Sequence, residues 1–500
     1  MKLKFALSML SLVSVLKLTA QEKQQEKPKD SIQKLDEVLI NSNAIFGNKY
    51  VAKNRTGSAY YVSPAELKKF SYTDINRVLR TIPGVTLYEE DGFGLRPNIS
   101  LRGTSPERSA KISLMEDGVL IAPAPYSAPS AYYFPSVARM QAVEVLKGSS
   151  QVQYGPFTTG GAINMISTQI PDNFNGKVRA SLGSFNTATL NAKVGDSKPT
   201  LGYMVEYLNF NSDGFKNLPD NSNTGFDINE VVAKFRVNSK VDAKLQQALE
   251  VKFQYSDEVT NETYLGLTEA DFANSPFDRY AASQVDQMNA EHLQLMLTHT
   301  LQFSKNFRIT TSGYYNKFSR NWYKLDDVVF GGEKVNIADV LSDPITFPNQ
   351  LSVLRGDIDS DEDALLVKAN NRKYLSKGLQ TKLDYHWYGE NTFHDLEIGL
   401  RYHYDEEDRF QWEDGFSIIN GDMNLTSLGE RGAQGNRINS ATAFASYAMY
   451  KLKYKNLTLT PGLRYENIIL QRDNYSSDDP NRTGSGLSSR ENKVDIFIPG

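Results

Sequence analysis

The sequence predicts an all-β transmembrane barrel preceded by an N-terminal α+β domain. Three observations predict this fold class. Segments alternate apolar and polar residues, the connections between them are alternately short and long, and no apolar run after the N-terminal signal is long enough for a membrane helix. Because only helices and closed barrels satisfy every backbone group in lipid, a membrane protein with this pattern is expected to be a barrel.

Residues 1–20 are predicted to be a secretory signal peptide. Lys2 and Lys4 precede an apolar run from Phe5 to Leu16, and the segment ends at Ala20. The run is shorter than the about 20 residues that cross a bilayer, which argues against a membrane anchor. Residues 21–49 are a charged, Gln- and Lys-rich linker in which we expect no folded domain.

Alternating segments carry the barrel prediction. In residues 245–255, 293–303 and 379–404, one face is mostly apolar and the other polar or charged. Gln247 and His299 fall on apolar faces and interrupt the pattern. Strands of about ten residues with one such face are typical of transmembrane barrels, and the 27 Tyr and 25 Phe suit aromatic girdles at the membrane interfaces.

The connections between these segments are of two kinds. Ser304, Lys305 and Asn306 form a tight turn, whereas residues 256–290, 322–363 and 405–439 form connections of roughly 30 residues or more. Loops that long are uncommon in compact domains and are usually functional. This asymmetry favours a membrane barrel over a soluble sandwich.

Residues 50–171 are predicted to form the separate α+β domain. Asp74 begins a helix in which Ile75, Val78, Leu79 and Ile82 recur at helical spacing, and Pro83-Gly84 ends it. Further along, Asp117-Gly118 between apolar strands indicates a hairpin. The glycines from 148 to 161 do not have the spacing of phosphate-binding loops, so we interpret them as allowing tight turns and close backbone approach.

A resemblance to a known family rests on residues 111–167, KISLMEDGVLIAPAPYSAPSAYYFPSVARMQAVEVLKGSSQVQYGPFTTGGAINMIS, and on the strand at residues 99–103 that ends in Arg-Gly. These segments resemble the plug domain of TonB-dependent outer-membrane receptors. The resemblance implies a plug at 50–171 inside the lumen of a barrel that begins at residue 172, in the outer membrane of a Gram-negative cell. We count about eleven strands to Gly500, about half of the family's 22, so we expect the chain to be a fragment or a truncated product.

A short β-prone segment precedes the plug and resembles the family's TonB box. Its residues are Leu35, Asp36, Glu37, Val38, Leu39 and Ile40. An extended, unpaired segment can add to the sheet edge of another protein through main-chain hydrogen bonds. The partner that the resemblance implies is the TonB–ExbB–ExbD energising complex.

Two segments are similar to the ferric dicitrate receptor group: residues 122–126 in the plug and residues 263–272 in a long loop. Members of this group tend to carry Gly-Gln after Ala-Pro-Tyr, and the Gln reaches the ligand, whereas this chain has Ser127-Ala128. An anionic iron chelate needs Arg and polar groups at the outer mouth. The candidate substrate-binding residues are Phe93, Arg96, Tyr126, Ser127, Ala128 and Arg279.

No other set of residues in the sequence has the spacing of a metal, catalytic or nucleic-acid-binding site. The five His show no metalloprotease spacing, and the run from Asp357 to Asp363 lacks the Gly and the final Glu of a calcium loop, so we expect no protein metal site and no cofactor, with iron carried only as the ligand chelate. No nucleophile–base pair supports an enzyme. A net charge of −4 gives no support for nucleic-acid binding.

The function that the sequence favours is active import of an iron chelate, ferric citrate or a related siderophore. Two alternatives stay open: uptake of another scarce solute, such as haem, cobalamin or a glycan, and a passive structural or adhesion barrel in the outer-membrane lipid. A plug and a TonB-box-like segment have no use in a passive barrel.

Overall fold

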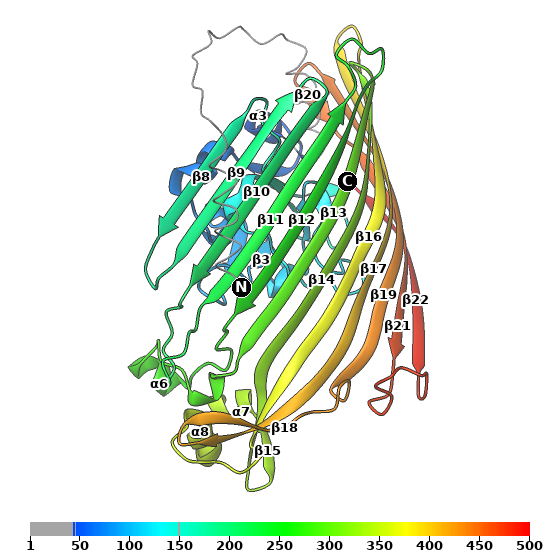
Figure 1. The fold of residues 1–500 in the computed structure, drawn as a ribbon. Helices are drawn as coiled ribbons and strands as arrows, with labels where there is room; N and C mark the ends of the chain where they lie inside the picture. The colour runs from blue at the N-terminus through cyan, green and yellow to red at the C-terminus, as the bar shows by residue number, and fades with distance from the viewer. Residues whose placement is uncertain (1–43, 46, 149–150) are drawn as a thin grey trace.

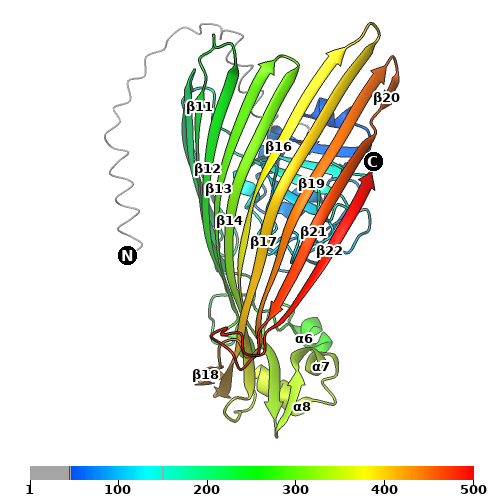
Figure 2. The same cartoon turned by 90° about the vertical axis from the view of Figure 1, so that its right-hand side faces the viewer.

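The computed structural model describes residues 44–45, 47–148 and 151–500. A long, curved antiparallel sheet carries a smaller domain on its concave side (Figures 1 and 2). The expected signal peptide at 1–20 and TonB box at 35–40 lie outside the described residues. In the described ranges no helix is long and apolar enough to cross a membrane.

The smaller domain is built from short helices and two small sheets. Its main sheet has the order β1-β6-β7-β4-β5, and β2 pairs with β3. The only parallel pair in that main sheet, within the described residues, is β4 with β7. The elements are α3 (Lys49–Lys53), β1 (Ser58–Val62), α4 (Pro64–Phe70), α5 (Ile75–Leu79), β2 (Val85–Tyr88), β3 (Asn98–Leu101), η1 (Glu107–Ser109), β4 (Ser113–Glu116), β5 (Val119–Leu120), η2 (Val137–Arg139), β6 (Met140–Lys147) and β7 (Ala162–Ser167).

Local sequence signals explain several of these elements. Asp117 and Gly118 both have positive φ, at 49° and 78°, as the two-residue hairpin between β4 and β5 requires. Asp74 caps α5 by accepting a hydrogen bond from the backbone N–H of Asn76. The helix ends at Leu79, earlier than the apolar spacing predicted, but Ile82 is still buried in the domain core.

A close backbone approach explains one glycine. Gly161 has φ 146°, and a Cβ there would lie 2.3 Å from the backbone oxygen of Leu146. Only glycine fits a position with both properties. This agrees with the structural interpretation of the glycine-rich segment.

The long sheet follows chain order in a meander of twelve strands from β8 to β22, with β15, β18 and β20 paired outside that path, among the described residues. The strands are β8 (Asn175–Leu182), β9 (Ala188–Lys198), β10 (Leu201–Ser212), β11 (Phe226–Asn238), β12 (Gln246–Thr260), β13 (Gln287–Ser304), β14 (Phe307–Phe330), β15 (Glu333–Asn336), β16 (Leu365–Tyr388), β17 (Thr392–Ile419), β18 (Asp422–Ser427), β19 (Gly435–Tyr454), β20 (Leu457–Leu459), β21 (Gly462–Asn474) and β22 (Ser488–Pro499).

Burial in this sheet is inverted relative to a soluble protein. On β12, Lys252 and Gln254 are buried against the inner domain, while Leu249 and Phe253 are 40% and 41% exposed on the outer face. Apolar residues outside and polar residues inside are what lipid on one side and a filled lumen on the other require. The two residues that interrupt the pattern, Gln247 and His299, contact each other across 3.2 Å between side-chain atoms.

The strands are longer than the about ten residues that the sequence predicted, and the long connections are correspondingly shorter. β16 has 24 residues and β17 has 28. Pairing continues through segments expected to be loops, and their side chains still alternate between the two faces of the sheet. The remaining connections also contain α6 (Glu269–Asn274), η4 (Ala281–Ser283), α7 (Ile337–Ser342) and α8 (Pro348–Arg355), gathered at one end of the sheet (Figure 1).

These connections pack around a core of their own. Leu265, Val340, Leu354, Val367 and Ile418 are buried there together, although they come from two different connections and two adjoining strand ends. The loops at this end therefore form one packed cap. At the other end, the turns are short and outward aromatic rings adjoin one another: Phe303, Phe307, Tyr385, Trp387 and Tyr450. Such a band of rings marks a membrane interface.

Candidate ligand site

A cavity of about 200 Å³ lies where the tip of the inner domain meets the sheet. The inner domain contributes one short segment around Ser127 and Ala128 together with Tyr132, and the sheet contributes side chains from four neighbouring strands. The lining residues are Ser127, Ala128, Pro129, Ser130, Tyr132, Arg372, Tyr374, Glu407, Arg409, Arg437, Asn439 and Arg472.

Arginines form a continuous row across the sheet at this level. Arg320 on β14 pairs in register with Arg372 on β16, which pairs with Arg409 on β17, which in turn pairs with Arg437 on β19. Like charges directly opposite each other on neighbouring strands destabilise a sheet. Four in one row leave an excess of positive charge that a bound anion would offset.

Few carboxylates balance these charges. Glu407 accepts hydrogen bonds from Arg372 and Arg409, each at 2.9 Å. Within the described part of the chain, Arg437 and Arg472 have no carboxylate partner within 4 Å, although Arg472 donates to the amide oxygen of Asn439 at 2.8 Å. The cavity is therefore strongly positive.

Tyr132 stands among these guanidinium groups. The Arg320 guanidinium lies 3.8 Å from its ring centre, and those of Arg108 and Arg372 lie 5.5 and 5.7 Å away. Burial raises the pKa of the Tyr132 hydroxyl, but the surrounding arginine charges outweigh it, so that pKa lies below its ordinary value. The shift shows how strongly the site favours negative charge.

Three of the predicted ligand residues lie at this cavity or beside it. Ser127 and Ala128 line it directly, and the Ser127 hydroxyl is buried without a hydrogen-bond partner. Tyr126 lies behind them: its backbone N–H and that of Ser127 donate to the Asp405 carboxylate at 2.7 and 3.0 Å. Arg401 donates to the Tyr126 hydroxyl at 2.9 Å, so Tyr126 fastens the tip to the sheet.

The other three predicted residues lie elsewhere. Phe93 packs against Phe226, with ring centres 4.9 Å apart. Arg96 is buried and paired with Glu258 on β12 and with Glu262 in the following connection. Arg279 donates only to nearby backbone oxygens among the described residues, those of Pro276 and Asp278. The structure does not bring these residues to the arginine row.

The arginines of the row were missed from the sequence. Each lies on a strand, far in sequence from the next, and each appeared as an ordinary polar residue of an alternating strand. Only the register of four strands places them side by side. A register predicted from the tight turns would have been the signal needed to find them.

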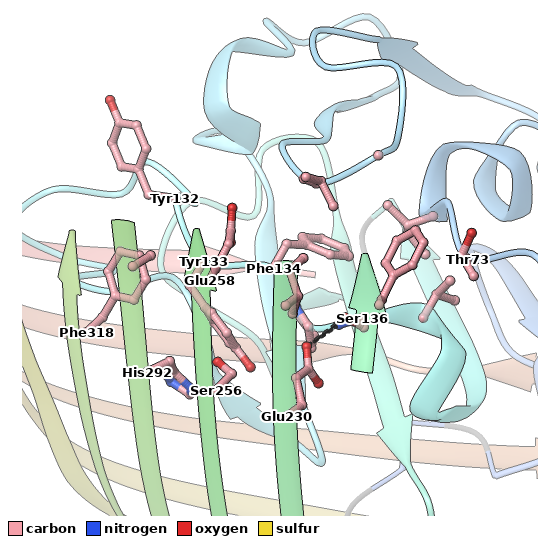
Figure 3. Close-up of a pocket in the computed structure, with 18 of the residues that line it drawn as sticks. Thr73, Tyr132, Tyr133, Phe134, Ser136, Glu230, Ser256, Glu258, His292 and Phe318 are labelled. Atoms are coloured by element: carbon pink, nitrogen blue, oxygen red, sulfur yellow. Dashed lines mark hydrogen bonds between the residues drawn. The ribbon is translucent and has the colours of Figure 1, made fainter. Parts of the chain in front are cut away.

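A second, smaller cavity of about 40 Å³ lies deeper, between the inner domain and β11 to β14. Tyr133 points into it and stacks on His292 with ring centres 3.7 Å apart, while the neighbouring Tyr132 points away (Figure 3). Ser136 donates to Glu230 at 2.6 Å on the opposite side (Figure 3). The inner domain is thus in close contact with the wall below the arginine row.

Comparison with known proteins agrees with this arrangement. Residues 52–162 match the TonB-dependent Receptor Plug Domain family. Among solved structures, the chain is similar to the ferric citrate transporter FecA in the unliganded form, with 19% identity, a TM-score of 0.68, and coverage of 91% of this chain and 61% of that one.

Two further structures show the same likeness. The ferric yersiniabactin uptake receptor FyuA from Yersinia pestis gives 14% identity, a TM-score of 0.61, and coverage of 90% of this chain and 61% of that one. The open form of the ferric-catecholate import receptor Fiu from E. coli K12 gives 15% identity, a TM-score of 0.62, and coverage of 89% of this chain and 66% of that one. The chain thus spans about three fifths of the length of these proteins.

The fold and the filled lumen define a plugged β-barrel. Residues 52–162 of the inner domain match the TonB-dependent receptor plug domain, and the long sheet has the fold of the barrel wall in the matched structures, left open between β8 and β22 in the described residues.

Proposed function

We propose that this protein imports an anionic iron chelate, ferric citrate or a related carboxylate siderophore, across the outer membrane. The observation that carries the proposal is the row Arg320, Arg372, Arg409 and Arg437: the last three line the cavity at the plug tip, and the first lies over the ring of Tyr132, which lines it too. Guanidinium groups bind carboxylates through paired, charge-assisted hydrogen bonds. A chelate with several carboxylates would be held by several of them at once.

The proposal includes energy coupling. The plug fills the lumen on the described side, so a solute as large as a chelate needs the plug to rearrange. We assign that work to TonB with ExbB and ExbD, acting on Leu35 to Ile40 by strand addition. The chelate is cargo, so iron is not a resident cofactor.

Neutral or haem-like solutes fit the site less well. Cobalamin and most glycans have no need of a row of arginines. Two histidines near the plug tip are buried: His403 lies 3.1 Å from Asp405 and 2.6 Å from the Tyr314 hydroxyl, and His292 stacks on Tyr133. Neither is open to the iron of a haem.

The direct test is titration of the full-length receptor with ferric dicitrate and with a neutral siderophore. We expect the citrate complex to bind, and Arg409→Ala to weaken binding by one to two decades, since a hydrogen bond to a charged group contributes about 1.5–3 kcal/mol. Arg482→Ala is the matched control, because Arg482 pairs with Asp408 and lies outside the cavity lining. Equal losses in both variants, or binding of the neutral siderophore alone, would refute the proposal.

A finer test separates citrate from other carboxylate chelates. Ala128 lines the cavity where the ferric dicitrate receptor group tends to carry a Gln. If citrate is the ligand, Ala128→Gln adds a donor and should tighten binding up to tenfold. Weaker binding of citrate by Ala128→Gln would instead indicate a bulkier chelate that the new side chain crowds.

The coupling segment is tested separately. Val38→Pro removes a main-chain donor and fixes φ, so it should abolish energised uptake while surface binding of the chelate stays unchanged. Val38→Ala is the control and should support uptake. Uptake by the Pro variant at the normal rate would show that Leu35 to Ile40 is only linker.

A further inference from the structure

On the side of the arginine row away from the packed cap of loops, the inner wall of β13, β14 and β16 changes from charged to uncharged side chains. We call the end with the cap the top and the end with short turns the foot. Going down two residues at a time, the lumen-facing partners in register are Tyr374, Phe318 and His292, then Ser376, Asn316 and Gln294, then Gly378, Tyr314 and Met296, then Gln380, Ser312 and Thr298, and then Lys382, Thr310 and Thr300. Apart from Lys382 at the lower end, every residue of this set is uncharged when its histidine is neutral. We call this set the neutral column.

Many hydrogen-bonding atoms in the neutral column lack a protein partner. They are His292 Nδ1, Gln294 Oε1 and Nε2, Thr300 Oγ1, Thr310 Oγ1, Asn316 Oδ1 and Ser376 Oγ, and all of them are buried. A buried polar group without a partner costs about 1–3 kcal/mol unless water satisfies it. Seven such atoms on three adjacent strands give this side of the contact between plug and wall polar groups that water or a polar solute could pair with.

The column joins two cavities. Arg372 and Tyr374 at its top line the cavity of about 200 Å³ at the arginine row. Thr310, Ser312, Gln380 and Lys382 at its foot line another of about 90 Å³ between the underside of the plug and the wall. Eight residues of β16 separate Tyr374 from Lys382, which is roughly 27 Å of strand and about the height of the membrane's apolar band.

The plug contacts the column mainly through aromatic and apolar groups. At the end next to the arginine row, Tyr133 stacks on His292 with ring centres 3.7 Å apart, and Phe318 and Tyr374 are buried in the core of the inner domain. Val119 packs on Met296 and Tyr314 at mid-height, and Gln380 donates to the Gly118 backbone oxygen at 3.0 Å. No ion pair within 4 Å joins the plug to the column among the described residues. Separating the plug from this wall therefore breaks aromatic and apolar contacts and the hydrogen bond from Gln380, but no ion pair in the ranges that the structure describes.

We propose that the neutral column is the route along which the anionic, hydrated chelate passes the plug. This rests on the proposed function for the nature of the cargo. Uncharged donors and acceptors replace the water around an oxygen-rich anion without trapping it, as a charged wall would. The narrow step at Val119, Met296 and Tyr314 is the gate that the energised plug opens.

The test places one negative charge in the column without changing its shape. Asn316→Asp is isosteric, and Asn316 has a buried, unpaired Oδ1. Asn238→Asp on β11 is the matched control, since Asn238 is also buried with an unpaired Oδ1 but lies outside the column. Binding of ferric dicitrate to intact cells and its energised uptake are measured separately for each.

We expect Asn316→Asp to slow uptake at least tenfold while binding stays within twofold, and Asn238→Asp to change neither. Normal uptake by Asn316→Asp, or equal slowing by both variants, overturns the column as a route. Lack of binding by the unmutated receptor instead refutes the proposed cargo.

A second measurement tests the column whatever the cargo. The printed sequence has no cysteine, so Asn316→Cys and Asn238→Cys each introduce a single thiol into it. A small anionic thiol reagent added outside should label Asn316→Cys faster in energised cells than in de-energised cells, and Asn238→Cys equally in both. If the labelling rate of Asn316→Cys is the same in energised and de-energised cells, the proposal that the energised plug opens this step is refuted.

Discussion

The walls of β11–β12 and of β13–β16 hold the same plug in opposite ways. On the first, Lys252 donates to Glu116 and Asp117 at 2.6 and 2.8 Å, and Arg139 joins Glu116 to Glu230, all nearly inaccessible to solvent. On the second, between the arginine row and Lys382, uncharged side chains face the plug and leave polar atoms unpaired. Buried ion pairs hold the plug to β11–β12, which we call the anchoring wall. The column on β13–β16, which we call the yielding wall, has none with the plug in the described part of the chain, so plug movement is expected to begin there.

Breaking the anchoring wall should have the largest effect. Arg139→Ala leaves Glu116 and Glu230 without their shared cation in a dry interface, and removing one partner of a buried pair costs about 3–5 kcal/mol. We expect the plug, but not the barrel, to become sensitive to protease and to exchange its amide hydrogens faster. Lys49→Ala is the control, because Lys49 pairs with Glu66 at the surface. Unchanged protection of the plug in Arg139→Ala would show that these pairs do not anchor it.

The alternation along each strand predicted much of this architecture. Polar residues of β12 and β13 face the lumen and apolar residues face outward, as the period of two required, and the Asp117-Gly118 hairpin forms as expected. Ser127 and Ala128, predicted to contact the ligand because they belong to a recognisable plug tip, line a cavity, and their part in binding stays a prediction.

The features that the sequence did not predict depend on pairing between strands that are far apart in the sequence. The arginine row, the anchoring pairs and the neutral column each combine residues far apart in sequence, and only the sheet register aligns them. Arg96 was a reasonable ligand candidate from its plug position, but Glu258 and Glu262 come from a distant strand and connection, so the sequence could not show that both carboxylates engage it.

The outer face of the yielding wall offers the next test. Leu295 on β13 follows Gln294 but points outward and is 50% exposed. Leu295→Arg should destabilise the barrel by about 2–4 kcal/mol if Leu295 lies near the bilayer midplane. Folding in lipid vesicles with denaturant measures it, with Leu295→Phe as control. A cost below 1 kcal/mol would mean that this face does not meet lipid.

The stability of the connection that follows β12, residues 261–286, should depend on pH. Burial raises the pKa of Glu262 to about 7, even though Arg96 is 3.1 Å away. The folded state therefore binds this proton more tightly than the unfolded chain, so stability is full at low pH and falls as pH rises from about 4.5 to 7, by about 3 kcal/mol at most.

Hydrogen exchange of residues 261–286, corrected for its intrinsic pH dependence, should accordingly show more opening at pH 8 than at pH 5.5. Glu262→Gln should remove most of the difference, because the amide cannot ionise. A loop that opens more at pH 5.5 in the unmutated receptor would mean that Arg96 holds Glu262 charged throughout this range.

The smallest effect distinguishes a wet column from a dry one. Gln294 is fully buried, and neither its amide oxygen nor its amide nitrogen has a protein partner. If the column is dry, Gln294→Leu relieves an unsatisfied amide and should stabilise the docked plug by about 1–3 kcal/mol. If water fills the column, the amide is already satisfied, and the same change should alter stability by less than about 1 kcal/mol. Protection of the plug amides in both proteins measures the difference, with Met296→Leu as a control for packing at the same wall. We expect the small change. Without water, seven unpaired polar atoms in one column would together cost more free energy than the few kcal/mol by which proteins are typically stable.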